Sequence, residues 1–259
     1  MSAHDKFNED CRNEIAGMGA DQVLRAVGRD WMDRANSHKY SYHFEWLGRP
    51  IIQYPQDVVA FQEIVWNVKP DLIIETGIAH GGSLILSASL LAMIDYCEAA
   101  ERGQSLDPAH PKRTVLGIDI DIRAHNRAAI DAHPMRSRIE MIEGSSVAPA
   151  IVAQVRAAAS KRTRVLVALD SNHTHAHVLE ELNCYAPLVS VGSYCIVYDT
   201  VIEDMPEDAF PDRPWGKGDN PKTAVWDYLK THPEFTIDHA VHDKLQLTVA
   251  PDGFLKRVR

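Results

Sequence analysis

Three side chains able to do acid–base chemistry stand just after two short apolar runs. Asp170 ends VLVALD, His173 follows it in SNHTHAH, and Asp199 ends YCIVYD. If these runs are adjacent parallel strands, their carboxyl ends bring Asp170 and Asp199 together at one edge of the sheet. Two carboxylates there suit Mg²⁺, which can bind a substrate hydroxyl and lower its pKa. His173 would then take the proton as a general base.

The same stretch allows two other interpretations. His173 and His177 share one face of an expected helix and could bind zinc, with His175 facing solvent. The two aspartates could instead only cap the helices that follow them. Both alternatives stay open at the level of the sequence.

A glycine turn, ETGIAHGGS (75–83), joins the apolar runs LII and LILSASLL. A turn between a strand and a helix commonly binds an anionic group at the helix N-terminus. Ala79 replaces the second glycine of the dinucleotide fingerprint and no G-K-[ST] follows, which disfavours a pyrophosphate. Glu75 suits a cationic group and the helix after Ser83 suits a carboxylate, and S-adenosylmethionine carries both groups.

The cofactor-binding residues expected in this turn are Glu75, Gly77, Ala79, His80, Gly81 and Ser83. The side chain of His80 could face either the cofactor or the solvent. A purely structural tight turn is the alternative.

Two further strand ends fit the same cofactor. VLGIDID puts Asp119 where a carboxylate accepts hydrogen bonds from both ribose hydroxyls. The polar excursion 98–113 explains most of the long spacing between Gly77 and Asp119. EGSS places Gly144 and Ser145 where they could line an adenine pocket. Three suitable strand ends in succession indicate a cofactor site.

The elements that must position these residues alternate between strand and helix. This order predicts an α/β fold with a Rossmann-like, doubly wound, mainly parallel sheet and additional N-terminal helices. FTIDHAV (235–241) and KLQLTVA (244–250) are expected to form an antiparallel C-terminal hairpin. The expected strands are 71–75, 115–118, 139–143, 165–169 and 194–198, and the expected helices are 21–35, one opened by Pro55, 83–97, 123–132, 147–160 and 174–186.

The chain is expected to divide near residue 55. Residues 1–55 form a helical and aromatic extension, and residues 56–259 form the Rossmann-like domain. Residues 205–222 hold four prolines and two glycines and are expected to be a lid, with a mobile surface loop as the alternative. Four aromatic residues of the extension could line an acceptor pocket, cover the sheet edge or contact another subunit: Tyr40, Tyr42, Phe44 and Trp46.

Composition excludes several classes of partner. The net charge is −9 over 259 residues with no run of Lys or Arg, which argues against nucleic acid and anionic membranes. The longest apolar run, 84–94, is too short to span a membrane, and the polar start is not a secretory signal. Four cysteines without metal spacing fit reduced thiols, so a cytoplasmic location is expected.

Four stretches together resemble the cephalosporin hydroxylase and rhamnosyl O-methyltransferase family: ETGIAHGGSLILSASLL, GIDID, LDSNHTHAHVLEELNCYAPLVSVGSYCIVYDT and PDGFLKR, with WLGRPIIQYPQD as a similar lead-in. The resemblance covers roughly residues 40–258. It implies a Rossmann-like, S-adenosylmethionine-dependent methyltransferase that acts on hydroxyls of sugars or natural products, and a homo-oligomer. It also implies that the glycine turn holds the methionine part and that Asp119 holds the ribose.

The family's metal site has an aspartate at the position of Asp170 and a Glu–Asp pair at the end of the next strand. This chain has Tyr198 and Asp199 there, so one acidic ligand is missing. Asp204, or its neighbour Glu203, could supply the missing oxygen. Otherwise the site would be free of metal, with His173 as the base.

The expected function is therefore O-methyl transfer from S-adenosylmethionine to a small-molecule acceptor, assisted by Mg²⁺ on Asp170, Asp199 and Asp204. An NAD-dependent oxidoreductase on the same fold is the first alternative, which Ala79 disfavours. A cofactor-binding protein without catalysis is the second, and Tyr198 is the feature that suggests it.

Overall fold

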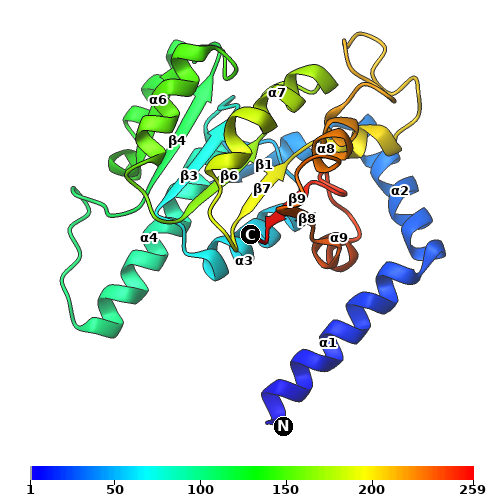
Figure 1. Ribbon diagram of the computed structural model, residues 1–259, viewed down its shortest axis with the longest axis horizontal. Helices are drawn as coiled ribbons and strands as arrows, with labels where there is room; N and C mark the ends of the chain where they lie inside the picture. The colour runs from blue at the N-terminus through cyan, green and yellow to red at the C-terminus, as the bar shows by residue number, and fades with distance from the viewer. Residues whose placement is uncertain (1) are drawn as a thin grey trace.

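A computed structural model describes residues 2–259, which form a sheet covered by helices on both faces (Figure 1). The strands run in the order β5-β4-β3-β6-β7-β9-β8, and β9 is antiparallel to both of its neighbours. The strand order reverses between β3 and β6, which is where open α/β sheets bind ligands. The strands are β3 Leu72–Thr76, β4 Thr114–Asp119, β5 Ile139–Glu143, β6 Val165–Leu169, β7 Tyr194–Val197, β8 Phe235–Ile237 and β9 Phe254–Arg257.

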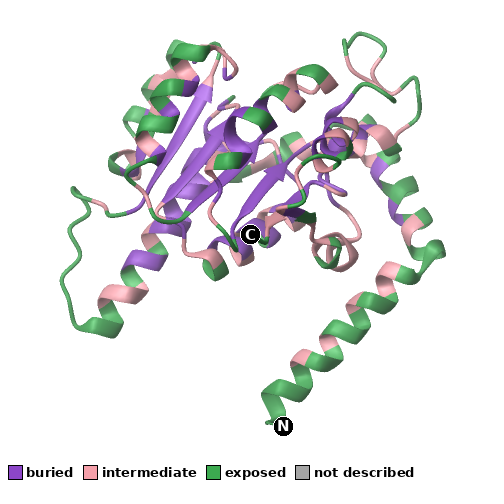
Figure 2. Ribbon diagram, in the orientation of Figure 1, coloured by how far each residue is buried: buried purple, intermediate pink, exposed green. Residues whose placement is uncertain are grey.

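The central strands are apolar along their whole length because both faces of the sheet are covered. Ile73 of β3 and Leu166 of β6 belong to one core cluster, while their neighbours Ile74 and Val167 belong to the other. Side chains alternate between the two faces of a strand, so adjacent residues enter different cores. Figure 2 shows these strands as the buried centre of the molecule. The expected doubly wound sheet is confirmed.

Helices α3, α4 and α5 cover one face of the sheet, and α6, α7 and α8 cover the other. The helices are α1 Ala3–Ala20, α2 Gln22–Ser37, α3 Pro55–Val68, α4 Gly82–Arg102, α5 Ala124–Asp131, α6 Pro149–Ala159, α7 His175–Tyr185, α8 Pro221–Leu229 and α9 His239–Leu245. By length and composition α4 could span a membrane, but 56% of its most apolar window is buried. Its apolar residues are those of a core helix.

The N-terminal segment combines an extended arm with a packed hairpin. Helix α1 projects away from the sheet and has no buried residue (Figure 2). The expected helix 21–35 forms as α2, although its Val23 and Val27 are exposed. A hairpin of β1 Phe44–Trp46 and β2 Arg49–Ile51 follows. It lies on α4, where the indole nitrogen of Trp46 donates to the hydroxyl of Ser89 at 2.9 Å.

The C-terminal antiparallel pair is confirmed, but its second strand lies later than expected. β8 pairs with β9 at 254–257, whereas residues 244–250 form the end of α9 and a loop. The hydroxyl of Thr248 and the amide of Val249 both donate to the buried carboxylate of Asp57 on α3. These bonds hold the segment against α3, so it does not pair as a strand.

Candidate active site

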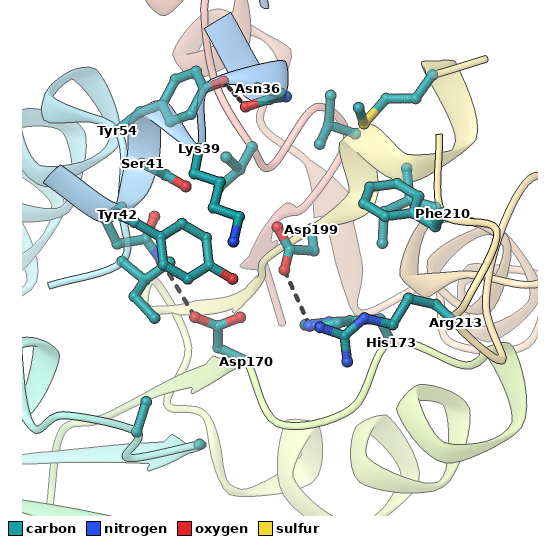
Figure 3. A pocket seen from close by; sticks show the side chains of 18 of the residues that line it. Asn36, Lys39, Ser41, Tyr42, Tyr54, Asp170, His173, Asp199, Phe210 and Arg213 are labelled. Carbon is teal, nitrogen blue, oxygen red and sulfur yellow. Dashed lines mark hydrogen bonds and ion pairs between the residues drawn. The ribbon is translucent and has the colours of Figure 1, made fainter. Parts of the chain in front are cut away.

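One cavity of about 650 Å³ opens at the carboxyl ends of β3, β6 and β7 (Figure 3). Its walls come from the N-terminal segment, the glycine turn, the ends of β6 and β7, and the loop after β7. A cavity of this size suits a small-molecule site. It brings together seven of the residues expected to bind a cofactor, a metal or the acceptor proton: Gly77, Ala79, His80, Ser83, Asp170, His173 and Asp199.

The glycine turn passes directly against the end of β6. Gly77 has φ +91°, and a Cβ built there would lie 2.1 Å from the carbonyl oxygen of Asp170. No side chain fits at that distance, so position 77 requires glycine. Gly81, with φ +85°, is the N-cap of α4 and is buried behind the turn.

Two residues that the sequence did not single out hold this turn. Arg49 of β2 donates from Nε to the carbonyl oxygen of His80 at 3.0 Å. Asn126 of α5 donates to the carbonyl oxygen of Ala79 at 2.8 Å and accepts from Arg49 Nη2 at 3.0 Å. Arg49 stands in WLGRPIIQYPQD, the stretch that is similar to the family's lead-in. His80 is among the residues that line the cavity.

The remaining strand ends lie beside the turn and outside the cavity wall. One carboxylate oxygen of Asp119 accepts from the backbone amides of Ile78 and Ala79 at 2.8 and 3.2 Å. The amide of Gly144 donates to the carbonyl oxygen of Asp119 at 2.8 Å, which places Ser145 next along the same edge. These residues form a row at the ends of β4 and β5 that leads away from the cavity.

Glu75 lies one layer below the turn. It is 4% exposed, accepts from the hydroxyl of Ser87, and leaves Oε2 buried without a partner. Burial raises the pKa of this carboxyl to about 7. Glu75 lines a second, inner cavity of about 20 Å³ together with Asp57, Asp170 and Tyr198. The two cavities share five lining residues: Ile51, Gln53, Gly77, Ser83 and Asp170.

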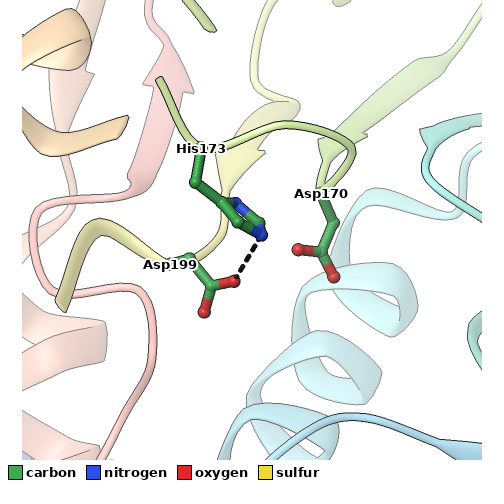
Figure 4. A group of neighbouring side chains, drawn as sticks. All are labelled: Asp170, His173 and Asp199. Atoms are coloured by element: carbon green, nitrogen blue, oxygen red, sulfur yellow. Dashed lines mark ion pairs between the residues drawn. The ribbon is translucent and has the colours of Figure 1, made fainter. Parts of the chain in front are cut away.

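Asp170, His173 and Asp199 form one cluster on the cavity wall (Figure 4). One ligand atom from each side chain lies within 4.8 Å of the other two, and Nε2 of His173 is 3.2 Å from Oδ2 of Asp199. Gln53 donates its amide to Asp170 at 3.3 Å. Burial, together with the charges of Asp199 and Glu75, raises the pKa of Asp170 well above its usual value.

The other acidic candidates lie elsewhere. Asp204 forms an ion pair with Lys222 at 2.6 Å, and Glu203 accepts from the amide of Gly218 at 2.8 Å. Neither residue lines the cavity. Tyr198 is buried and lines the inner cavity instead of the larger one, and burial raises its pKa. The position of the missing acidic ligand is therefore filled by a phenol directed into the core.

The two other histidines of the motif point away from the cluster. His175, expected to face solvent, is half-buried, and its Nδ1 lies 2.8 Å from the hydroxyl of Thr223 on α8. Nε2 of His177 lies 3.5 Å from Oε1 of the buried Glu181. A zinc site made by His173 and His177 does not form.

The loop 205–222 covers the cluster. Trp215 packs edge-to-face on the ring of His173, with centroids 4.8 Å apart. The guanidinium of Arg213 lies over the Trp215 ring at 5.2 Å. Phe210 also lines the cavity. On the opposite wall, the extension contributes Lys39 and Tyr42 (Figure 3).

Comparisons with known proteins bear on the family of the chain. The model of the family described as Rhamnosyl O-methyltransferase/CmcI matches residues 38–258. The chain is 30% identical over 204 residues to a rhamnosyl O-methyltransferase of Mycobacterium tuberculosis. The aligned region covers 78% of this chain and 73% of that protein. It is 29% identical over 214 residues to the rhamnosyl O-methyltransferase of Mycobacterium leprae, which spans 82% of each.

A solved structure of CmcI with Mg and SAM has the same fold, with a TM-score of 0.55 and 18% identity over 84% of this chain and 78% of that one. Family membership favours a methyltransferase over the oxidoreductase alternative. The chain therefore belongs to the rhamnosyl O-methyltransferase/CmcI family and is an S-adenosylmethionine-dependent methyltransferase.

Proposed function

We propose that this methyltransferase moves a methyl group to a hydroxyl of a sugar or another natural product, with His173 as the general base. The relatives are rhamnosyl O-methyltransferases, so their acceptors are sugars. The observation that carries the proposal is the His173–Asp199 pair on the wall of a cavity that also contacts the glycine turn.

The acidic groups behind the glycine turn support a cofactor that carries positive charge. The inner cavity is lined by three carboxyl groups, those of Asp57, Glu75 and Asp170, and by no Lys or Arg. One oxygen of Glu75 is buried without a partner. Buried acidic groups of this kind favour a cationic ligand nearby. When bound, S-adenosylmethionine supplies the methyl group from a positively charged sulfur.

The residues around the turn would hold the rest of the cofactor. The turn from Gly77 to Ser83 would take the methionine part, because it ends at the N-terminus of α4. Asp119 would bind the ribose, and the row continues to Gly144 and Ser145 at the expected adenine pocket. The shared cavity would then place the acceptor next to Asp170 and His173.

His173 would accept the proton of the acceptor hydroxyl on Nδ1, because Nε2 holds its hydrogen toward Asp199. Asp199, 3.2 Å away, would orient the imidazole and stabilise its protonated form. Asp170 would hold the hydroxyl by a hydrogen bond. The loop 205–222, through Trp215 against His173, would exclude water from the site.

Mg²⁺ fits these residues poorly. It prefers octahedral oxygen ligands, and Asp170 and Asp199 are the two carboxylates that the cluster offers. The third group within reach is an imidazole nitrogen, while Asp204 is paired with Lys222. We therefore assign no step of the reaction to Mg²⁺.

Two assays test the function. Calorimetric titration with S-adenosylhomocysteine and with NADH should show binding of the first alone; the reverse result would overturn the proposal. Labelled S-adenosylmethionine with a panel of rhamnosides and glycosylated natural products should then yield an O-methylated product. Asp170→Ala and His173→Ala should each strongly lower turnover. Binding without turnover of any acceptor would support the non-catalytic alternative.

The homo-oligomer and the cytoplasmic location remain predictions. Val23 and Val27 on α2, together with Phe7 on α1, are exposed apolar side chains that a second subunit would cover. Light scattering coupled to gel filtration, on the full chain and on Val23→Ser/Val27→Ser, tests the first of these predictions.

A further inference from the structure

The cluster of Asp170, His173 and Asp199 has a donor set that differs from the acidic set expected from the family resemblance. Two carboxylates and one imidazole replace three carboxylates, because Tyr198 is directed into the inner cavity. Imidazole suits zinc, cobalt, nickel and copper, whereas an all-oxygen set suits magnesium. This ligand set therefore suits a divalent transition-metal ion better than it suits Mg²⁺.

The geometry of the cluster is close to that of such a site. The three ligand atoms lie within 4.8 Å of one another, and one pair is already at 3.2 Å. Bonds of about 2.0–2.2 Å in a tetrahedral zinc site put ligand atoms about 3.4 Å apart. Ligand-atom separations would have to shorten by at most about 1.4 Å, from 4.8 Å to about 3.4 Å, to close the cluster around an ion. The adjoining cavity leaves the fourth position open to water or acceptor.

Two neighbouring side chains already contact two of the proposed ligands. Gln53 donates to Asp170 at 3.3 Å, and Trp215 packs on the imidazole of His173 with centroids 4.8 Å apart. Such supporting groups orient ligands in metal sites. His175 is turned toward Thr223, and in residues 2–259 no other group of three such ligands is found.

We propose that Asp170, His173 and Asp199 form a site for a divalent transition ion of the zinc class, and that binding there competes with the role of His173 as base. An ion bound to Nε2 leaves the neutral imidazole with its hydrogen on Nδ1, so His173 then has no free lone pair for the proton of the acceptor. The consequence for catalysis rests on the proposed function, but the binding itself does not. Zn²⁺ is accordingly an inhibitor of methyl transfer, and Mg²⁺ is not an activator.

Co²⁺, whose visible absorption reports coordination, is the probe. Titration of the full chain should give ligand-field bands of a four- or five-coordinate site. His173→Gln should lower Co²⁺ affinity at least tenfold, and a large excess of Mg²⁺ should not displace the ion. His175→Gln is the matched control, because His175 stands two residues after His173 but turns toward Thr223; this variant should bind Co²⁺ like the wild type. Equal affinity in His173→Gln, or displacement by Mg²⁺, would overturn the site.

Activity gives a separate measurement. Zn²⁺ at one equivalent should inhibit methyl transfer, and a chelator should restore it. Activation by Zn²⁺ would overturn the competition with His173. Loss of all methyl transfer in the metal-free protein, with Co²⁺ binding intact, would refute the base role of His173 in the proposed function and leave the metal site standing.

Discussion

Nε2 of His173 lies 3.2 Å from Oδ2 of Asp199, although the two residues follow different strands, β6 and β7. The pairing depends on the parallel register of these strands, in which Leu169 lies opposite Val197. Asp199 adopts φ +55°, a left-handed conformation that turns the chain just after the strand. The sheet thus brings the two strand ends close together, and the turn at Asp199 directs its carboxylate toward His173.

Removing either member of this pair should lower kcat by about 10²–10⁴-fold, because general-base catalysis contributes that much. His173→Ala and Asp199→Asn should each show the loss, and the double variant should lose little more than His173→Ala, since the two act as a unit. Steady-state methyl-transfer rates provide the measurement, with His175→Ala as the control that stays near wild type. Additive losses would show that the residues act independently.

Gly77→Ala should destabilise the fold and weaken cofactor binding, because its Cβ would clash with the carbonyl oxygen of Asp170. Gly48→Ala is a matched control: Gly48 has φ +82° but no atom within 4 Å of a built Cβ. Backbone strain alone costs about 1–3 kcal/mol. Urea unfolding of both variants should show a larger loss at Gly77, and equal losses would remove the role of the close approach.

The stability of the ligand-free protein should fall as pH rises from about 4 to 7. Burial raises the pKa values of Asp57 and Glu75 to about 7, so the folded state keeps protons that the unfolded chain releases near pH 4. Unfolding free energy falls with pH wherever the folded state binds more protons. The two groups should together lower it by a few kcal/mol between pH 4 and pH 8.

Asp57→Asn should flatten this pH dependence, since the amide has no proton to lose. Urea midpoints at pH 5 and pH 8 measure the change, and the exposed Glu140→Gln serves as the control. An unchanged slope in Asp57→Asn would show that Asp57 stays ionised in the folded protein.

Trp215→Ala should lower kcat/KM by about tenfold, because an aromatic contact of about 1 kcal/mol that positions His173 is lost and water gains access. Trp226→Ala removes an exposed indole that packs near Lys222 and should leave kcat/KM unchanged. If the two variants behave alike, the loop 205–222 does not act as a lid.

The strands of the sheet were predictable because they are continuous apolar runs. β5 and β6 match their expected bounds, and β3 and β4 each differ from them by one residue at both ends. The segment 244–250 misled because Leu245, Leu247 and Val249 alternate like a strand. Its polar groups are bound by Asp57, almost 200 positions away in the sequence, and no local pattern reveals that contact.

The site was predictable where strand ends supply it and not where distant segments do. Asp170, His173 and Asp199 follow from their position after β6 and β7. Gln53, in the stretch WLGRPIIQYPQD, and Trp215, in the loop 205–222, reach the cluster from outside the strand–helix alternation, and no local pattern reveals their contacts with it. N-terminal helices were predicted, but not the bounds of α1, because none of its residues is buried and it carries no apolar stripe.

The contact between Gly77 and the carbonyl oxygen of Asp170 has a consequence for engineering. Changes that move the backbone at either position will alter cofactor affinity and acceptor chemistry together, so this part of the wall is a poor place to vary specificity. Tyr42, in the N-terminal wall, and Phe210, in the loop after β7, line other parts of the cavity. Exchanging those two segments between relatives offers a route to new acceptors with the cofactor site left intact.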